Sequence, residues 1–206
     1  MKRKLFPILE YDKTRKAIIN PSAFFDGKTI PENVVLCFFK DVIRELRVKH
    51  RIKEIACCRS EMGKHPIYEL KIGKKCISVF HSAVGAPLAA GLFEELIALG
   101  GKKFIACGGA GVLDRNISAG HIMVPVSAIR DEGVSYHYLP PSREVRPSVK
   151  ALKAIVNVLK NEKLSYLKCK TWTTDAPYRE TPEKITLRKK EGCLSVEMEA
   201  ASQCFS

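Results

Sequence analysis

The sequence lacks the long apolar runs of a membrane protein. None of its hydrophobic stretches approaches the roughly 20 consecutive residues that a helix needs to cross a bilayer. The basic opening Met1–Lys4 is soon followed by Glu10, Asp12 and Lys13, which interrupt the apolar region that a secretory signal requires. We therefore expect a cytoplasmic protein without a membrane partner.

The sequence also lacks the spacings that mark metal and redox sites. Its eight cysteines include no C-x-x-C pair, which argues against zinc-ribbon and thioredoxin-like sites, and its five histidines show no ligand spacing. Several cysteines, among them Cys37 and Cys107, lie in apolar runs, where reduced cysteines behave as small buried hydrophobes. We expect no metal site and no disulfide framework.

Acidic residues are scarce relative to basic ones. The 206 residues contain 35 Lys and Arg against 22 Asp and Glu, which gives a net charge of +13. The excess is spread evenly over both halves of the chain and forms no basic tail. This distribution favours a solvated, lysine-rich surface, and we expect no nucleic-acid partner. A positive field also suits an anionic small-molecule substrate.

Short apolar runs of strand length alternate with segments of helical periodicity. Residues 34–39 form a continuous apolar run, as expected for a strand buried on both faces, and residues 104–107 are predicted as another buried strand. This alternation predicts an α/β fold with a mixed central sheet flanked by helices. Further strands are predicted at 68–72, 76–80, 122–126 and 171–174, and helices at 41–53, 87–99, 147–162 and 182–191.

The length of the chain favours a single domain with a sizeable core. Residues 1–33 are mixed in character and carry Pro7, Pro21 and Pro31, so we predict an irregular N-terminal arm. The α/β domain is predicted to fill residues 34–206.

Gly108-Gly-Ala-Gly111 follows a predicted strand but matches neither common phosphate-binding pattern. The G-x-G-x-x-G spacing of dinucleotide folds is absent, and so is the Gly-Lys-Ser/Thr ending of a P-loop. Glycines here either make a tight turn or let backbone N–H groups approach a ligand closely. Both interpretations stay open on the residues alone.

Two carboxylates, Glu197 and Glu199, lie two positions apart in an apolar setting. Side chains at this spacing point to different sides of a strand or helix, so the two cannot form one catalytic pair. One of them can face a site and accept two hydrogen bonds from a vicinal diol. The alternative is an exposed glutamate that is favoured by a helix N-terminus.

Five segments in this order resemble the nucleoside phosphorylase superfamily. That superfamily includes purine nucleoside phosphorylases, uridine phosphorylases and the adenosylhomocysteine/methylthioadenosine nucleosidases. The resemblance runs from about residue 34 to residue 201, and Val-Glu-Met-Glu-Ala is the segment most similar to the family signature. The segments are Arg59-Ser-Glu-Met-Gly63, Val84-Gly85, Gly108–Gly111, Thr174-Asp-Ala-Pro-Tyr178 and Val196-Glu-Met-Glu-Ala200.

The resemblance implies a phosphorylase/hydrolase-like fold and a pentosyltransferase, a type of glycosyltransferase. The implied reaction is phosphorolysis of a nucleoside, purine or uridine, to free base and ribose 1-phosphate. It uses inorganic phosphate as co-substrate and needs no metal or organic cofactor. The implied ribose-binding residues are Val84, Glu197, Met198 and Glu199, with Glu199 bonding the 2′ and 3′ hydroxyls and Met198 packing on the sugar.

The resemblance also assigns the phosphate and base sides of the site. Arg59 matches an arginine that reaches into the neighbouring subunit's site, so the chain is expected to form a homo-oligomer. The implied phosphate-binding residues are Arg59, Gly108 and Gly109, and the implied base-binding residues are Ala110, Gly111, Asp175 and Tyr178.

Several positions depart from the family pattern. Ala106 stands where the phosphorylases have an arginine, Gly109 replaces a hydroxyl residue, and Phe38–Asp41 replaces a Gly-Asp-Pro turn that cradles phosphate. Pro177 occupies the place of a base-stacking aromatic residue. A hydrolytic nucleosidase, which does not need the phosphate arginine, is therefore an alternative.

The family's catalytic aspartate is expected to lie beyond Ser206. In the family, the Met-Glu helix is followed by a strand that carries this aspartate and by a covering helix. The sequence therefore predicts a domain without its last strand and helix, and no catalytic residue is assigned within it. A catalytically impaired member that binds nucleosides or forms oligomers is a second alternative.

Overall fold

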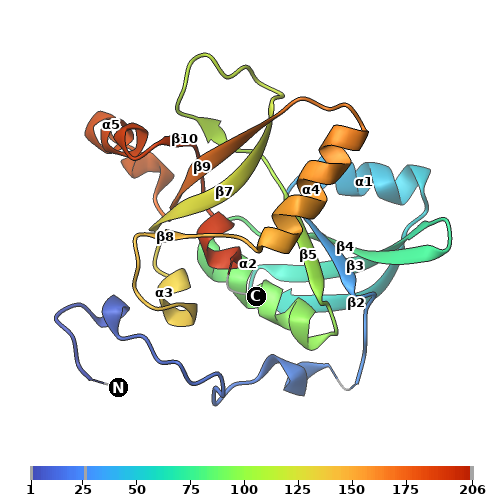
Figure 1. Cartoon of the computed structure of the whole chain (residues 1–206). Coiled ribbons are helices and arrows are strands. Elements are labelled where there is room, and N and C mark those ends of the chain that lie inside the picture. The colour runs from blue at the N-terminus through green and yellow to red at the C-terminus, as the bar shows by residue number, and fades with distance from the viewer. Residues whose placement is uncertain (1, 26, 205–206) are drawn as a thin grey trace. The chain divides into compact units, whose positions relative to one another are not determined.

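A computed structural model describes residues 2–25 and 27–204. The predicted arm and domain also include residues 1, 26 and 205–206, and these lie outside the described residues. The chain divides into two compact units, each with its own five-stranded sheet (Figure 1). Unit 1 comprises Met1–Lys13, Gly85–Pro87 and Ala110–Ser206, and unit 2 comprises Thr14–Val84 and Leu88–Gly109.

The sheet of unit 2 has the strand order β2-β3-β4-β1-β5. β1 is parallel to β4 and β5, whereas β2, β3 and β4 form an antiparallel meander. Gly73, with a φ of +59°, makes the tight turn between β3 and β4, and the strands predicted at 68–72 and 76–80 are confirmed as parts of this hairpin. The strands are β1 (Asn33–Cys37), β2 (Lys53–Ser60), β3 (Gly63–Ile72), β4 (Lys75–His81) and β5 (Lys103–Cys107).

Two helices accompany this sheet, α1 (Lys40–Lys49) and α2 (Ala86–Ala98). Leu92 and Leu96 of α2 are buried, and Phe93 packs edge-to-face on Phe104 of β5 with ring centroids 4.5 Å apart. On α1, Ile43 packs in a buried cluster with Cys37, Tyr68 and Val79. Both predicted helices are confirmed, but α1 ends at Lys49, and residue 53, predicted as helical, begins β2.

The sheet of unit 1 has the strand order β6-β10-β9-β7-β8. β7, β9 and β10 are parallel neighbours, and short antiparallel strands flank them on both edges (Figure 1). Ile129, Trp172, Cys193 and Val196 form the buried core of this sheet. The strands are β6 (Gly111–Val112), β7 (Ile122–Asp131), β8 (Glu144–Val145), β9 (Tyr166–Thr174) and β10 (Cys193–Glu197).

Unit 1 contains the α-helices α3 (Ser135–Tyr138), α4 (Val149–Asn161) and α5 (Pro182–Lys190). α5 begins where the sequence predicts, because the Thr181 hydroxyl accepts a hydrogen bond from the Lys184 N–H and proline fits the first turn. The buried Arg188 ties α5 to the sheet, since one of its nitrogens lies 3.2 Å from Asp131 Oδ2.

The N-terminal arm has little regular structure. Two short 3-10 helices, Pro7–Leu9 and Pro21–Phe24, interrupt an otherwise irregular path, and each begins at a proline. Apolar side chains such as Leu5 and Ile18 are exposed along it. Residues up to Lys13 group with unit 1, and residues from Thr14 onward group with unit 2.

The predicted α/β class, with mixed sheets flanked by helices, is confirmed, and the strands are divided between two sheets. The predicted burial of residues 104–107 is wrong. These residues form β5, but β5 is the edge strand of its sheet, and Ile105 is 47 % exposed. Cys37 is buried as expected, whereas Cys107 is exposed.

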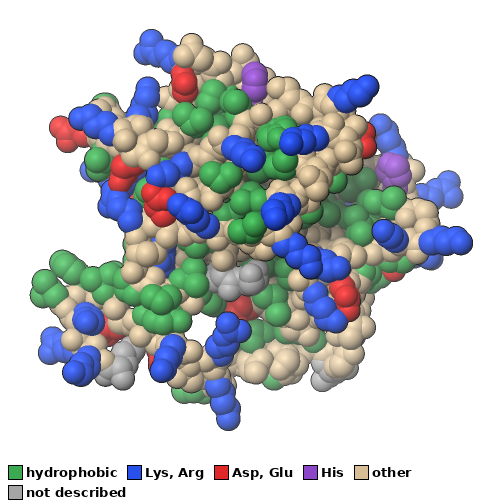
Figure 2. All heavy atoms as spheres, in the orientation of Figure 1, with side chains coloured by type: hydrophobic (Ala, Val, Ile, Leu, Met, Phe, Trp, Pro, Cys, Tyr) green, Lys and Arg blue, Asp and Glu red, His purple; other side chains and the backbone are tan. Residues whose placement is uncertain are grey.

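Charge is distributed as the composition suggests. Figure 2 shows Lys and Arg side chains spread over the face in view, among apolar side chains. None of the helices within residues 2–25 and 27–204 is both long and apolar enough to cross a bilayer. The cytoplasmic location stays a prediction.

Candidate functional site

The parallel strands of unit 1 end at one edge of their sheet. β7 ends at Asp131, which is in register with Thr174 at the end of β9, and Thr173 is in register with Glu197 at the end of β10. In α/β folds, ligands bind outside the carboxyl ends of such strands. The structure therefore brings two predicted segments, Asp175–Tyr178 and Glu197–Glu199, to one edge.

Glu199 is joined to the predicted Val84–Gly85 segment. One carboxylate oxygen accepts a hydrogen bond of 2.6 Å from the Gly85 N–H, and the other accepts one of 3.3 Å from the Met198 N–H. Gly85 has a φ of +93°, which glycine adopts without strain. Burial raises the pKa of Glu199, and these two N–H donors oppose the shift. A carboxylate accepts about four hydrogen bonds, so Glu199 keeps acceptor capacity for a ligand.

Glu197 is bound within the protein. One carboxylate oxygen accepts from the hydroxyls of Thr173 at 2.6 Å and Thr171 at 3.3 Å. The other oxygen accepts from the N–H groups of Glu199 at 2.7 Å and Ala200 at 2.5 Å. Burial raises the pKa of Glu197, and the hydrogen bonds from Thr173, Ala200 and Glu199 oppose the rise. The two carboxylates have different partners, in line with the sequence argument against one catalytic pair.

Asp175 and Tyr178, which the resemblance assigns to the base, are both exposed. The Asp175 carboxylate accepts a hydrogen bond of 2.8 Å from the Gly133 N–H, and Tyr178 is 98 % exposed. The arm also reaches this end of the sheet. A Cβ added to Gly133 would lie 3.7 Å from both the Asp175 carboxylate and the Ile8 side chain.

A buried polar network, which no sequence motif predicts, supports the loop that carries Gly133. Arg130 is only 4 % exposed and its guanidinium lies over the Tyr136 ring, 4.1 Å from the centroid. Glu132 accepts hydrogen bonds from the N–H groups of Val134 and Ser135. The run Arg-Asp-Glu-Gly, which lies a few residues beyond the strand predicted at 122–126, is the one signal that the sequence offers for this network. Arg130 donates to Ser135 Oγ at 2.8 Å, Pro140 O at 2.7 Å, Ser142 Oγ at 2.8 Å and Leu139 O at 3.3 Å.

The glycine turn after β5 packs against aromatic side chains within unit 2. A Cβ added to Gly108 would lie 3.0–3.3 Å from side-chain atoms of Phe38, and one added to Gly109 would lie 3.8 Å from Phe39. The Phe38 N–H donates to Cys107 O at 2.9 Å. Gly108 is thus needed for close approach of the Phe38 ring.

The remaining predicted residues lie as follows. Arg59 is exposed on β2, an edge strand of unit 2, and Val84 is 71 % exposed and directly precedes Gly85. In unit 1, Ala110 is exposed and Gly111 begins β6, where an added Cβ would lie 3.0 Å from Val196. Arg59, Val84, Gly108 and Gly109 belong to unit 2, and the other predicted site residues belong to unit 1.

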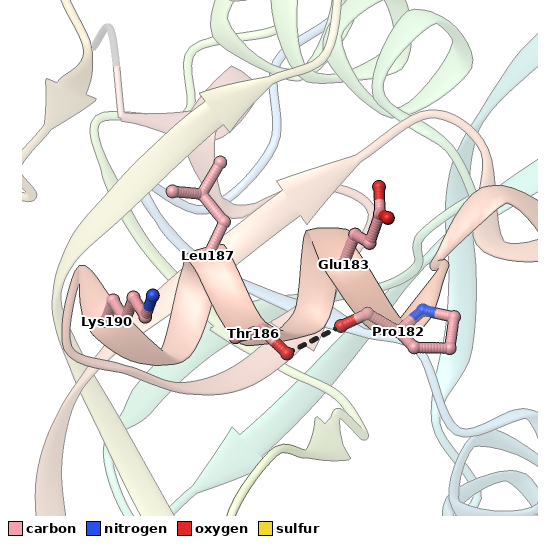
Figure 3. A pocket seen from close by; sticks show the side chains of 5 residues that line it. All are labelled: Pro182, Glu183, Thr186, Leu187 and Lys190. Atoms are coloured by element: carbon pink, nitrogen blue, oxygen red, sulfur yellow. Dashed lines mark hydrogen bonds between the residues drawn. The ribbon is translucent and has the colours of Figure 1, made fainter.

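Two surface cavities are lined by other residues. One, of about 330 Å³, is lined by five side chains of α5 alone, and Figure 3 shows Thr186 bonded back to the Pro182 carbonyl. The other, of about 320 Å³, lies in unit 2 between arm residues, including Ile19 and Phe24, and α2 residues, including Leu92. Within the described ranges, His, Cys, Asp and Glu side chains nowhere gather in a group of three that suits a metal ion.

The fold and the site define an α/β protein with a candidate diol-binding carboxylate at the carboxyl ends of parallel strands. Comparison of the sequence with models of protein families matches residues 34–205 to the phosphorylase superfamily, and the chain belongs to that superfamily. The family predicted from the motif order is therefore confirmed.

Individual relatives agree with this assignment. The purine nucleoside phosphorylase DeoD-type 1 of Shewanella oneidensis is 31 % identical over 150 residues, which are 72 % of this chain and 62 % of that protein. The chain thus spans less than two thirds of that relative's length.

Two solved structures share the fold. A uridine phosphorylase from Vibrio fischeri superposes with a TM-score of 0.76 and 23 % identity, over 87 % of this chain and 74 % of that one. An AMP nucleosidase from Bacteroides thetaiotaomicron superposes with a TM-score of 0.74 and 21 % identity, over 85 % of this chain and 74 % of that one. At this level of identity they establish the fold alone.

Proposed function

We propose that the protein cleaves the glycosidic bond of a nucleoside by phosphorolysis, giving free base and ribose 1-phosphate. The observation that carries the proposal is the Glu199 carboxylate, which is held by the Gly85 N–H at the carboxyl ends of the parallel strands. Inorganic phosphate is the co-substrate, and no metal or organic cofactor takes part. The purine nucleoside phosphorylase relative supports this choice.

Glu199 acts by fixing the sugar. Ionised, it accepts hydrogen bonds from the 2′ and 3′ hydroxyls, and Met198 packs on the ribose. Cleavage passes through a state in which positive charge develops on the sugar ring. A carboxylate that holds the hydroxyls in place stabilises that state more than the ground state, provided that its contacts tighten as the charge develops.

The other predicted residues supply phosphate and base binding. Asp175 and Tyr178 hold the base together with the turn at Ala110 and Gly111. Gly108 and Gly109 offer backbone N–H groups to phosphate, and Arg59 offers a guanidinium fork. Because Arg59 is exposed on an edge strand, we assign it to the phosphate site of a second subunit in a homo-oligomer.

Hydrolysis by a nucleosidase is the second candidate, and one observation favours it. The Phe38 ring packs against Gly108, so an apolar side chain covers the turn that would offer N–H donors to phosphate. Ala106, at the position of the family arginine, is exposed on β5. Water needs neither the arginine nor the N–H cradle.

A phosphate-dependence assay separates the candidates. Purified protein is incubated with inosine, guanosine, adenosine or uridine, with and without phosphate, and free base and ribose 1-phosphate are quantified. Phosphorolysis requires that base release depend on phosphate. Equal release without phosphate establishes the nucleosidase, and nucleoside binding without turnover in calorimetry establishes an impaired member.

The Glu199→Gln variant tests the assigned role of the carboxylate. Loss of the charge weakens its bonds to the diol, and hydrogen bonds to charged groups are worth about 1.5–3 kcal/mol. We expect kcat/KM to fall about 10- to 100-fold. Glu183→Gln, on the exposed face of α5, is the matched control and retains wild-type activity. A Glu199→Gln variant as active as the control would refute the ribose assignment.

A further inference from the structure

Thr173 lies one residue before the end of β9 and is fully buried. Its hydroxyl donates to the Glu197 carboxylate at 2.6 Å and accepts from the Ala201 N–H at 3.0 Å. One hydroxyl therefore joins the end of β10 to the 3-10 turn that follows Met198 and Glu199.

The same carboxylate completes the connection. Glu197 also accepts from the N–H groups of Glu199 and Ala200. Three successive backbone N–H groups, from Glu199 to Ala201, are thus tied to the pair Thr173–Glu197. These bonds fix the backbone at the residue whose carboxylate meets Gly85.

We infer that Thr173 is a positioning residue that aims the Glu199 carboxylate at a ribose diol. It acts through Glu197 and the turn, and it does not itself touch the ligand. The inference rests on the proposed function in one respect, the identity of the ligand as a ribonucleoside. The clamp, defined as Thr173 and Glu197, is a property of the fold.

Removal of the hydroxyl would loosen the turn. Without the Thr173 hydroxyl, the Ala201 N–H loses its acceptor, and the Glu197 carboxylate loses a close donor. A buried polar group without a partner is strongly disfavoured, so the turn rearranges to find one. Glu199 then meets the diol in several orientations, and hydrogen bonds weaken steeply with misalignment.

The first test uses Thr173→Val, which has nearly the same shape as threonine, and measures kcat/KM for a ribonucleoside and its 2′-deoxy analogue. Wild type is expected to prefer the ribonucleoside, and the variant is expected to lose about tenfold of that preference, which corresponds to about 1.4 kcal/mol. Thr173→Ser, which keeps the hydroxyl, is expected to restore it. Ser195→Ala is the control, because it removes a buried hydroxyl of the same sheet whose partner is a thiol.

The preference ratio distinguishes positioning from general damage. A merely destabilised protein loses activity on both substrates equally, and its ratio stays at the wild-type value. That result would overturn the inference, and so would a wild type that cleaves both substrates alike. If Thr173→Val fails to fold, the pair Thr173→Ser and Thr173→Ala, which differ by the hydroxyl alone, gives the same comparison.

A second test needs no nucleoside. Hydrogen exchange of the Glu199, Ala200 and Ala201 amides is followed in wild type, Thr173→Ser and Thr173→Val. We expect exchange to accelerate at least tenfold in Thr173→Val and to stay near wild type in Thr173→Ser. If wild type neither binds nor cleaves nucleosides, the proposed function fails, and amide exchange still decides on the clamp. Unchanged exchange in Thr173→Val refutes the clamp itself.

Discussion

Replacement of Arg130 by methionine tests whether the network at the end of β7 holds unit 1 together. Methionine retains much of the apolar stem but removes every donor. In the native protein the guanidinium makes four hydrogen bonds of 2.7–3.3 Å and lies over Tyr136. Pro140 and Ser142 are exposed, so water replaces the donor at those two acceptors.

The loss is concentrated at the acceptors that water does not reach. Ser135 is fully buried and Leu139 is partly buried, and a stranded buried acceptor costs about 1–3 kcal/mol. The buried Glu132 also loses a neighbouring positive charge. We expect the free energy of unfolding to fall by about 3–5 kcal/mol. For a chain of this size the corresponding drop in Tm is about 6–20 °C.

Trp172 provides the assay. It is the chain's one tryptophan, it is fully buried in unit 1, and its fluorescence therefore reports unfolding of that unit. Thermal and urea unfolding of Arg130→Met are compared with Arg146→Met, an exposed arginine of the same unit. If the free energy of unfolding of Arg130→Met lies within about 1 kcal/mol of that of Arg146→Met, the network does not stabilise unit 1 as argued.

Three further predictions concern single side chains. Gly91→Ala, in an open position of α2, is expected to raise the free energy of unfolding by about 0.5–1 kcal/mol. Gly101→Ala is expected to lower it, because the added Cβ would lie 2.7 Å from a ring atom of Phe104. Urea unfolding measures both effects. Burial raises the pKa of Glu197 above its ordinary value of 4.5, so the stability of wild type relative to Glu197→Gln should be greatest below pH 4.5 and should fall as pH rises through the raised pKa. Thermal unfolding of both proteins across a pH series measures this. A difference in Tm that does not change with pH contradicts the prediction. If Asp175 holds the base as proposed, Ile8→Ala should raise KM for nucleosides about fivefold with kcat unchanged, because the Ile8 side chain lies beside Gly133, which donates to Asp175. Steady-state kinetics are compared with those of Leu5→Ala, whose side chain is 88 % exposed and which should have no effect.

Elements with local signals could be predicted from the sequence. The Thr181-Pro182 pair marks the start of α5, and the glycine at position 73 marks the hairpin turn between β3 and β4. Strand β1 was visible as a continuous apolar run. In each case the residues that determine the element lie within or next to it.

Strand β2 and the exposure of β5 could not be predicted this way. β2 has two charged residues followed by four apolar ones and Arg59, and its end falls in the segment Arg59–Gly63, which the sequence marks as a motif and not as a strand. β5 has the composition of a buried strand, but its position at the sheet edge depends on strand order, which no local pattern encodes.

The candidate site shows the same division. The type and setting of Glu197 and Glu199 indicated that one of them can face a site, and the resemblance of Val-Glu-Met-Glu to the family signature assigned that role to Glu199. The sequence did not reveal that Glu197 is bound by threonines 24 and 26 positions away, because the parallel pairing of β9 and β10 creates those contacts. The Arg130 network was missed because a charged run after a strand is usually solvated.

Cys107 gives the protein a native handle for chemical labelling. Of the eight free thiols it alone is exposed, while four are buried and three are partly buried. Partial burial and the neighbouring Cys37 raise the pKa of Cys107, so a maleimide reacts efficiently only at mildly alkaline pH, where the thiolate forms. A fluorophore attached there stands next to Gly108 and reports events at the glycine turn without an engineered cysteine.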